Sequence, residues 1–206
     1  MGKRLYGKKL GMTRYFLDEG GSTAATIIKA GPCVVIQKKT VDKDGYEAIQ
    51  IGFELQKGDR VNKPLQGHFR AAGERVFRHL REIRVEDASA FELGQEIGVD
   101  IFSIGDTVTV SARSKGRGFT GVVKRWGFSG GKSTHGCRSH KVPGSIGASA
   151  TPGRVAKGKK LPGRMGNQRT TVKNLKVVDV RPEMGVIALK GAVPGSKNSI
   201  VEISGA

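Results

Sequence analysis

The sequence predicts a mainly β protein in which one globular domain is interrupted by a long, basic and largely irregular segment. Three observations support this prediction. Runs rich in β-branched residues lie toward both ends of the chain, at about 23–53 and 171–203. Between Asp106 and Asp179, 72 consecutive residues contain no Asp or Glu but sixteen Lys and Arg. Inside that window, from Ser111 to Arg169, apolar residues recur at neither the strand spacing nor the helix spacing.

Turn residues divide the first part of the chain into candidate strands. Thr23 to Ala30 and Val34 to Thr40 are rich in β-branched residues, and Gly31-Pro32 separates them as a turn signal. Tyr46 to Phe53 continues the pattern after Asp44-Gly45, a dipeptide typical of tight hairpins. We therefore expect a hairpin between the second and third of these runs.

The next stretch has a looser pattern. From Lys57 to Arg84 basic residues recur without clear alternation, which favours a loop with one short helix at about Pro64 to Ala72. We expect an irregular basic subregion at about 57–100. Phe102 to Val110 begins another strand, with apolar alternation at its end.

Strand patterns return at the end of the chain. Apolar spacing resumes at Thr171, and Pro182 to Gly185 predicts a turn into a strand at Val186 to Lys190. Ile200 to Ile203 forms a last strand. Because strands flank the basic segment on both sides, the segment is an insertion. The expected bounds are 1–110 and 171–206 for the globular domain and 111–170 for the inserted loop.

The charge restricts the class of partner. The acid-free window carries +16 of the chain's net +18, so the segment repels itself unless a polyanion surrounds it. No apolar run approaches the ~20 residues of a membrane-spanning helix, and Gly and Pro interrupt any amphipathic helix in the window. Met1 to Tyr15 lacks the apolar core of a secretory signal, and two cysteines make no disulfide framework. We expect a cytoplasmic protein that binds nucleic acid.

The inserted segment has the residue types that contact RNA. Lys and Arg are spread along its whole length, which suits a chain threaded among phosphates on several sides. Gly116, Gly118 and Gly121 allow the backbone to approach ribose and phosphate closely. Trp126, the only Trp, is a candidate for stacking on an unpaired base. The candidate binding residues are Lys115, Arg117, Lys124, Arg125, Trp126, Lys132, His135, Arg138, His140, Lys141, Arg154, Lys157, Lys159, Lys160, Arg164 and Arg169.

Three other kinds of site fit less well. Gly131-Lys132-Ser133-Thr134 resembles the end of a phosphate-binding loop, but Trp126 stands where that motif needs its first Gly. His135, Cys137 and His140 lack a fourth ligand for structural zinc, and Cys137 with His140 lacks a nearby orienting carboxylate for nucleophilic catalysis. We therefore expect no metal, no cofactor, no small-molecule substrate and no catalytic residue.

Several motifs, in order along the chain, resemble the large-subunit ribosomal protein L-three family in its bacterial form. They are Lys8-Lys9-Leu10-Gly11-Met12-Thr13, Ser114 to Trp126 (SKGRGFTGVVKRW), Thr134-His135-Gly136, Ser139 to Gly147 (SHKVPGSIG), Thr151-Pro152-Gly153, Gly158 to Asn167 (GKKLPGRMGN) and Lys190 to Gly195 (KGAVPG).

The resemblance implies a translation-protein-like β-barrel with a long loop that enters large-subunit (23S) ribosomal RNA near the peptidyl transferase centre. It also implies an early role in subunit assembly and contacts with ribosomal proteins of the fourteen and nineteen families. The loop tip, Trp126 to Ala150, would approach RNA on the aminoacyl-tRNA side. This chain has Thr109 where the family signature usually has Asp or Asn before the basic run. Ala150 stands where some relatives carry a methylated Gln, so no modification is expected there.

Three readings from other classes compete with a structural RNA-binding protein. An RNA-modifying or phosphoryl-transfer enzyme would need acids beside the basic segment, where the sequence has none. A protein that compacts DNA independently of its sequence fits the charge but not the rigid pattern of Gly and Pro in the segment. A disordered basic tail would be expected at a terminus and in simpler sequence.

Overall fold

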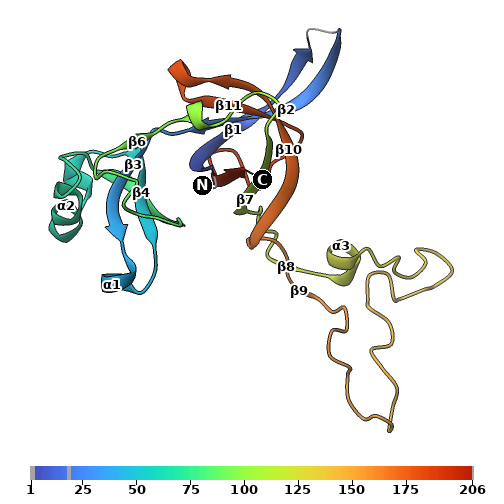
Figure 1. Cartoon of the computed structure of the whole chain (residues 1–206). Helices are drawn as coiled ribbons and strands as arrows, with labels where there is room; N and C mark the ends of the chain where they lie inside the picture. The colour runs from blue at the N-terminus through green and yellow to red at the C-terminus, as the bar shows by residue number, and fades with distance from the viewer. Residues whose placement is uncertain (1–2, 18–19, 206) are drawn as a thin grey trace. The chain divides into compact units, whose positions relative to one another are not determined.

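The computed structural model describes residues 3–17 and 20–205, and the chain divides into two compact units. Unit 1 comprises Met1–Arg113 and Arg169–Ala206, and unit 2 comprises Ser114–Gln168. The expected domain bounds 1–110 and 171–206 include residues 1–2, 18–19 and 206, which lie outside the described residues. The prediction of a mainly β fold is confirmed (Figure 1).

Six antiparallel strands of unit 1 form a closed barrel in the order β1-β12-β7-β10-β11-β2. The register shifts within β1 and twice within β10, and such bulges bend strands enough to help a sheet close on itself. The strands are β1 (Arg4–Leu17), β2 (Gly21–Ala30), β7 (Thr107–Arg113), β10 (Arg169–Arg181), β11 (Val186–Lys190) and β12 (Ile200–Gly205).

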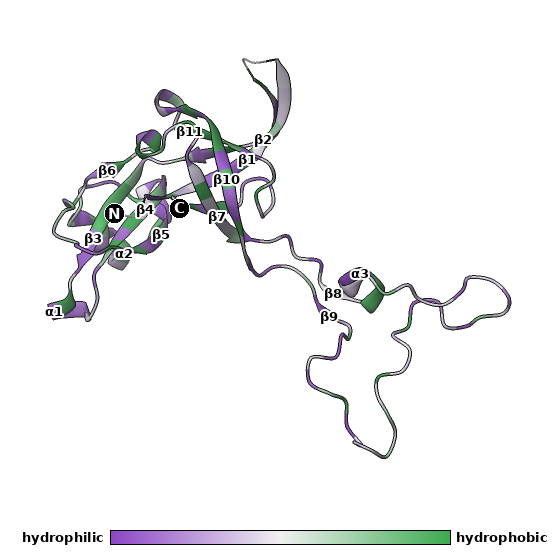
Figure 2. Cartoon of the chain, turned by 45° about the vertical axis from the view of Figure 1, so that its right-hand side comes forward, coloured by the Kyte–Doolittle hydropathy of each residue, from purple (hydrophilic) through white to green (hydrophobic). Residues whose placement is uncertain are grey.

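Alternation along these strands fills the barrel interior. Val108 and Val110 of β7 are fully buried. Thr109, which lies between them, and Ser111, which follows Val110, are only partly buried. The same pattern brings Val201 and Ile203 of β12 into the core. Figure 2 shows this alternation as hydrophobic and hydrophilic bands along β7 and β10.

A second sheet in unit 1 has the order β5-β4-β3-β6, with strands β3 (Cys33–Lys39), β4 (Ala48–Leu55), β5 (Phe77–Arg84) and β6 (Glu96–Ile97). The predicted β3–β4 hairpin is confirmed, but its connection contains a helical turn, α1 (Val41–Asp44), that ends at Gly45 with φ 81°. One set of buried residues of this sheet, which includes Phe53 of β4, shares a core with those of the barrel, which include Tyr6 of β1. Val34, Ile36 and Phe77 belong to a second, smaller cluster.

The short helix predicted near Pro64 is confirmed as α2 (Lys63–Arg70). The side chain of Asn62 caps its first turn by accepting a hydrogen bond from the Leu65 backbone N–H. Phe69 is buried against β3 and β5, and its ring meets that of Phe77 edge-on with centroids 6.0 Å apart. Short 3-10 turns lie at η1 (Gly58–Arg60), η2 (Val99–Ile101) and η3 (Pro182–Met184).

Several strands differ from the expectation. β1 lies in a charged stretch that has no clear strand pattern, and it is recognisable through its pairing with β2 and β12. The irregular subregion expected at about 57–100 is wrong where β5 and β6 run, because the Arg-rich β5 pairs with β4 over its full length. Strand β7 also starts later than predicted and continues to Arg113, and β10 begins at Arg169.

Candidate nucleic-acid interface

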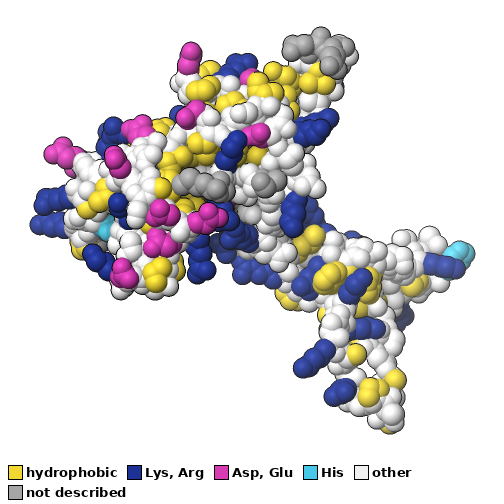
Figure 3. Space-filling view, in the orientation of Figure 1, with side chains coloured by type: hydrophobic (Ala, Val, Ile, Leu, Met, Phe, Trp, Pro, Cys, Tyr) yellow, Lys and Arg dark blue, Asp and Glu magenta, His cyan; other side chains and the backbone are white. Residues whose placement is uncertain are grey.

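Unit 2 has a one-sided charge composition. It contains twelve Lys and Arg and no Asp or Glu, so no ion pair can form inside it. In Figure 3 the acidic side chains that are visible all belong to unit 1, and the visible charged groups of unit 2 are Lys, Arg and His. Unit 2 therefore has a positive charge that only an outside partner can neutralise.

A two-stranded stem holds the two ends of unit 2 together. We define the stem as residues 114–120 and 163–168, which include β8 (Phe119–Thr120) and β9 (Gly163–Arg164). Beyond those strands, the Arg117 N–H donates to the Met165 carbonyl at 2.9 Å and the Met165 N–H donates to Gly118 at 3.0 Å. The Ser114 N–H donates to the Gln168 carbonyl at 2.9 Å. Backbone hydrogen bonds thus join the two strands of the stem along its length.

A helical turn, α3 (Val122–Trp126), closes the stem. The Arg125 guanidinium donates to the Leu161 carbonyl oxygen at 2.7 Å, and the Trp126 indole N–H donates to the same oxygen at 3.0 Å. The guanidinium also lies 4.9 Å from the centroid of the Trp126 ring. We call these three residues the clamp; it ties α3 to the start of the returning strand.

At two glycines of the stem, an added Cβ would meet a neighbouring group. A Cβ on Gly163 would lie 2.5 Å from Nη1 of Arg125, inside the clamp. Gly166 has φ 71°, and a Cβ there would collide with the Lys115 carbonyl oxygen. Gly166 therefore allows the two strands of the stem to lie close together, and Gly163 leaves room for the Arg125 guanidinium.

Residues 127–162 have no helix or strand and are organised by turns. The Gly131 N–H donates to the carbonyl of Ser139 at 3.1 Å, and His140 Nδ1 lies 3.0 Å from the Lys132 carbonyl oxygen. Gly131 to Thr134 therefore lacks the strand and helix that a phosphate-binding loop needs. No three His, Cys, Asp or Glu side chains gather as a possible metal site among the residues the structure describes.

The structure separates the candidate RNA-binding residues into three groups. The first group lies at the clamp: Arg125 is half-buried in it, Trp126 belongs to it, and Lys160 lies 5.8 Å from the Trp126 ring. The second group is Arg169 alone, which belongs to unit 1 and donates to Glu202 at 2.7 Å. The remaining side chains are exposed with no acidic partner in unit 2: Lys115, Arg117, Lys124, Lys132, His135, Arg138, His140, Lys141, Arg154, Lys157, Lys159 and Arg164. Phe119, 82% exposed, was missing from the predicted set, although its position after Lys115-Gly116-Arg117-Gly118 could have indicated it.

In unit 1, by contrast, carboxylates balance many of the basic groups. Lys3 pairs with Asp106 at 2.9 Å, Lys8 with Glu54 at 2.8 Å, and Lys39 with Glu82 at 2.9 Å. Hydrogen bonds from these lysines lower the pKa of each carboxyl partner below its ordinary value. The net positive charge is thus concentrated in unit 2, which has no carboxylate to balance its Lys and Arg. Among the described residues, no helix has the length and apolarity needed to cross a bilayer.

Comparison with known proteins identifies the family. The model of the family described as Ribosomal protein L3 matches residues 84–186, which include all of unit 2. Proteins named large ribosomal subunit protein uL3 are 53% identical in Citrifermentans bemidjiense, 51% in Geotalea daltonii and 52% in Thermotoga petrophila. The first two alignments cover 98% of this chain and 96% of the relative, and the third covers 99% and 97%. The chain belongs to the ribosomal protein L3 family.

Proposed function

We propose that this protein is a non-catalytic structural constituent of the large ribosomal subunit and binds 23S rRNA directly through unit 2. The observation that carries the proposal is the acid-free composition of unit 2, in which every Lys and Arg except the half-buried Arg125 is exposed. A polyanion that surrounds the unit would neutralise this charge from several sides. The names of the close relatives support the choice of the large subunit over other nucleic-acid assemblies.

The cations of unit 2 would act as counter-charge between RNA helices, with the exposed Lys and Arg as the binding residues. The segment beyond the clamp, residues 127–160, has few interactions of its own, so RNA would complete its ordering. A segment whose ordering is completed by its partner fits a protein that joins the RNA early in assembly. In this scheme the tip, Trp126 to Ala150, supports the RNA around the peptidyl transferase centre.

The chemistry of peptide transfer would belong to the RNA. Unit 2 has no carboxylate that could act as acid, base or orienting group, and its histidines are exposed on turns. With Ala at position 150, side-chain amide methylation is also ruled out at that position. We further propose a location in cytoplasmic ribosomes, with neighbours from the ribosomal protein fourteen and nineteen families. These last points rest on the family resemblance.

Co-sedimentation with large-subunit particles over a salt series tests the proposal. In one variant, Lys132, Arg138, Lys141 and Arg154 are all replaced by Gln. The slope of log affinity for rRNA against log salt concentration should become shallower by about 3, since each lost phosphate contact reduces that slope by about 0.7–0.9. The matched control replaces four exposed cations of unit 1, which are Lys43, Lys57, Lys63 and Arg70. An equal loss in both variants would mean that overall charge, and not unit 2, drives binding.

Limited proteolysis gives an independent test. The free protein should be cut first within residues 127–160, and the same sites should resist cleavage in the assembled subunit. Equal protection in the free and assembled protein would contradict ordering by RNA. Cleavage in unit 1 before unit 2 would contradict the inference that residues 127–160 are the least stably folded part of the free protein.

A further inference from the structure

Phe119 is an exposed aromatic residue on the stem of unit 2. Its side chain is 82% exposed, more than any other large apolar side chain in the described part of the chain. It follows Gly118, whose φ of 66° favours glycine, and it lies in β8 opposite Arg164 of β9. The ring is therefore accessible to a partner from a defined position on the strand.

The stem fixes the direction in which Phe119 points. Its neighbour Thr120 is buried, and the Thr120 hydroxyl donates to the Arg117 carbonyl at 3.2 Å. Opposite Thr120 lies Gly163, where Arg125 of the clamp fills the space that a Cβ would occupy. Successive side chains of a strand point to opposite faces. Thr120 and Gly163 therefore face the clamp, and Phe119 and Arg164 share the outer face.

Directly opposite residues in an antiparallel pair have Cβ atoms roughly 4.5–5.5 Å apart. The outer face of the stem thus presents a phenyl ring beside an exposed guanidinium. A ring can stack on any base, and a guanidinium can hold an adjacent phosphate through two hydrogen bonds. No carboxylate in unit 2 competes for Arg164.

The clamp makes Trp126 a poorer candidate for this role. Its indole N–H is satisfied by the Leu161 carbonyl, and two cations, from Arg125 and Lys160, lie over its ring. Among the described residues, Phe119 has no aromatic or cation partner. The ring that is available to an outside partner is therefore that of Phe119.

We propose that Phe119 and Arg164 form a site for an unpaired RNA base, with the base stacked on the phenyl ring and its phosphate held by the guanidinium. This proposal rests on the proposed function. It adds the part of unit 2 that contacts an RNA base, in addition to the contacts with the RNA phosphate backbone. The positive charge around the ring favours a nucleotide over an apolar protein surface as its occupant.

A single-tryptophan reporter tests the site directly. The double variant Phe119→Trp, Trp126→Phe has its only indole at position 119, and the unaltered protein has its only indole at 126. Both are titrated with protein-free 23S rRNA from one of the bacterial relatives. Stacking on a base should quench the indole at 119 strongly and the clamped indole at 126 much less. Equal quenching at both positions, or quenching only at 126, overturns the proposal.

A substitution series separates stacking from simple burial. Phe119→Tyr should bind the rRNA like the unaltered protein, and Phe119→Ala and Phe119→Leu should each bind about tenfold more weakly at high salt. Leu keeps the apolar bulk and loses the ring, so full binding by Phe119→Leu would indicate that apolar bulk without a ring is sufficient and would overturn the stacking site. Val155→Ala is the matched control, because Val155 is an exposed apolar residue of the same unit.

The outcomes distinguish the two proposals. If the unaltered protein does not bind 23S rRNA at high salt, the proposed function itself fails. If it binds, and Phe119→Ala binds equally well, only the base-stacking site fails. Circular dichroism of each variant, compared with the unaltered protein, shows that the stem and barrel remain folded.

Discussion

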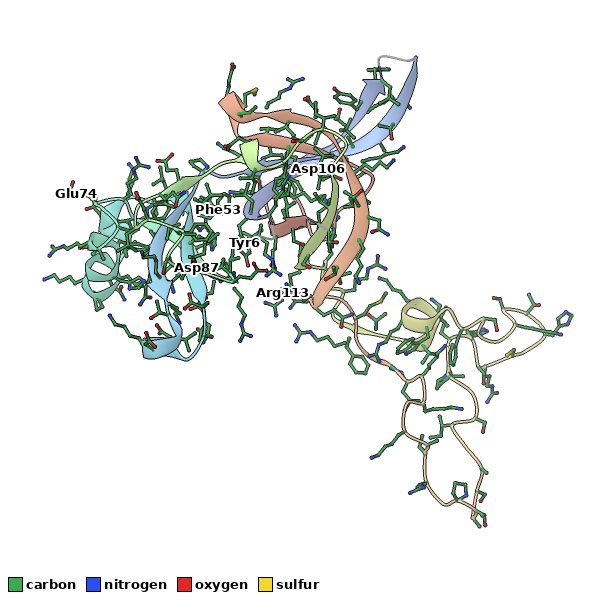
Figure 4. All side chains as sticks on the ribbon, in the orientation of Figure 1. Tyr6, Phe53, Glu74, Asp87, Asp106 and Arg113 are labelled. Carbon is green, nitrogen blue, oxygen red and sulfur yellow. The ribbon has the colours of Figure 1, made fainter. Side chains whose placement is uncertain are left out.

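Arg113, the last residue of β7, lies directly opposite Arg169, the first residue of β10. The whole of unit 2 is therefore inserted between two positions that face each other across an antiparallel pair. Figure 4 labels Arg113 at this end of the barrel. Two like charges in such a pair repel each other, and the bond from Arg169 to Glu202 on β12 offsets that repulsion.

This pairing predicts that unit 1 folds without unit 2. Replacing residues 114–168 by Asn-Gly, the dipeptide that suits a two-residue hairpin, joins Arg113 to Arg169 in their existing register. The shortened protein should unfold cooperatively with a Tm at or above that of the full chain, since a shorter loop costs less entropy to close. Calorimetry measures this. Loss of a cooperative transition would mean that the barrel needs unit 2. The shortened protein should also lose rRNA binding at high salt.

The clamp predicts a specific effect of one added methyl group. Gly163→Ala places a Cβ against the Arg125 guanidinium and should displace it from the Leu161 carbonyl. Trp126 should then become more exposed, with a red-shifted emission and faster proteolysis of residues 127–160. Gly121→Ala is the control, because φ there is −69° and a Cβ would meet nothing within 4 Å. Similar spectra for the two variants would contradict the clamp.

The ion network around Glu54 predicts a pH-dependent stability. Its carboxylate accepts a hydrogen bond from Lys8 at 2.8 Å and lies 3.8 Å from Arg78 and 3.6 Å from His79. The bond from Lys8 lowers the pKa of Glu54 below its ordinary 4.5, so the network stabilises the fold above that pH and is lost as the pH falls through the lowered value. Glu54→Gln should therefore destabilise the protein by about 0.5–1 kcal/mol at pH 7 and by less near pH 3.

Denaturant titration at the two pH values measures this difference. Glu74→Gln is the control, since Glu74 is exposed and makes no ion pair with any residue in the described ranges (Figure 4). A Glu54→Gln penalty that stayed constant with pH would show that the side chain acts through packing and not through charge.

The two cysteines should differ in reactivity. Cys33 is fully buried, and burial raises the pKa of its thiol to about 11, so at pH 8 it is neutral and shielded. Cys137 is half-buried in unit 2. A thiol reagent should modify one cysteine rapidly in the folded protein and both in denaturant. Cys137→Ser should abolish the rapid reaction, and a rapid reaction that survives this change would contradict the burial of Cys33.

Much of the organisation could be predicted because it depends on local signals. The strands near Thr23 to Ala30, Val34 to Thr40 and Val186 to Lys190 have β-branched runs between turn residues, and all are present. β5 could not be predicted with the same rule, because its sequence is rich in exposed arginines and not in β-branched residues. Its pairing with β4 is seen only in the structure. β1 was missed because its bulge breaks the alternation and its partners lie at both ends of the chain.

The sequence by itself determined the charge asymmetry of this protein, because residue types need no coordinates: an acid-free stretch stays acid-free however it folds. It also determined that this stretch is inserted between strands. Only the tertiary structure decided which aromatic ring is available to a partner. The pairing of Phe119 with Arg164 and of Thr120 with Gly163 joins residues far apart in the sequence. That pairing turns Trp126 into part of the clamp and leaves Phe119 in the solvent.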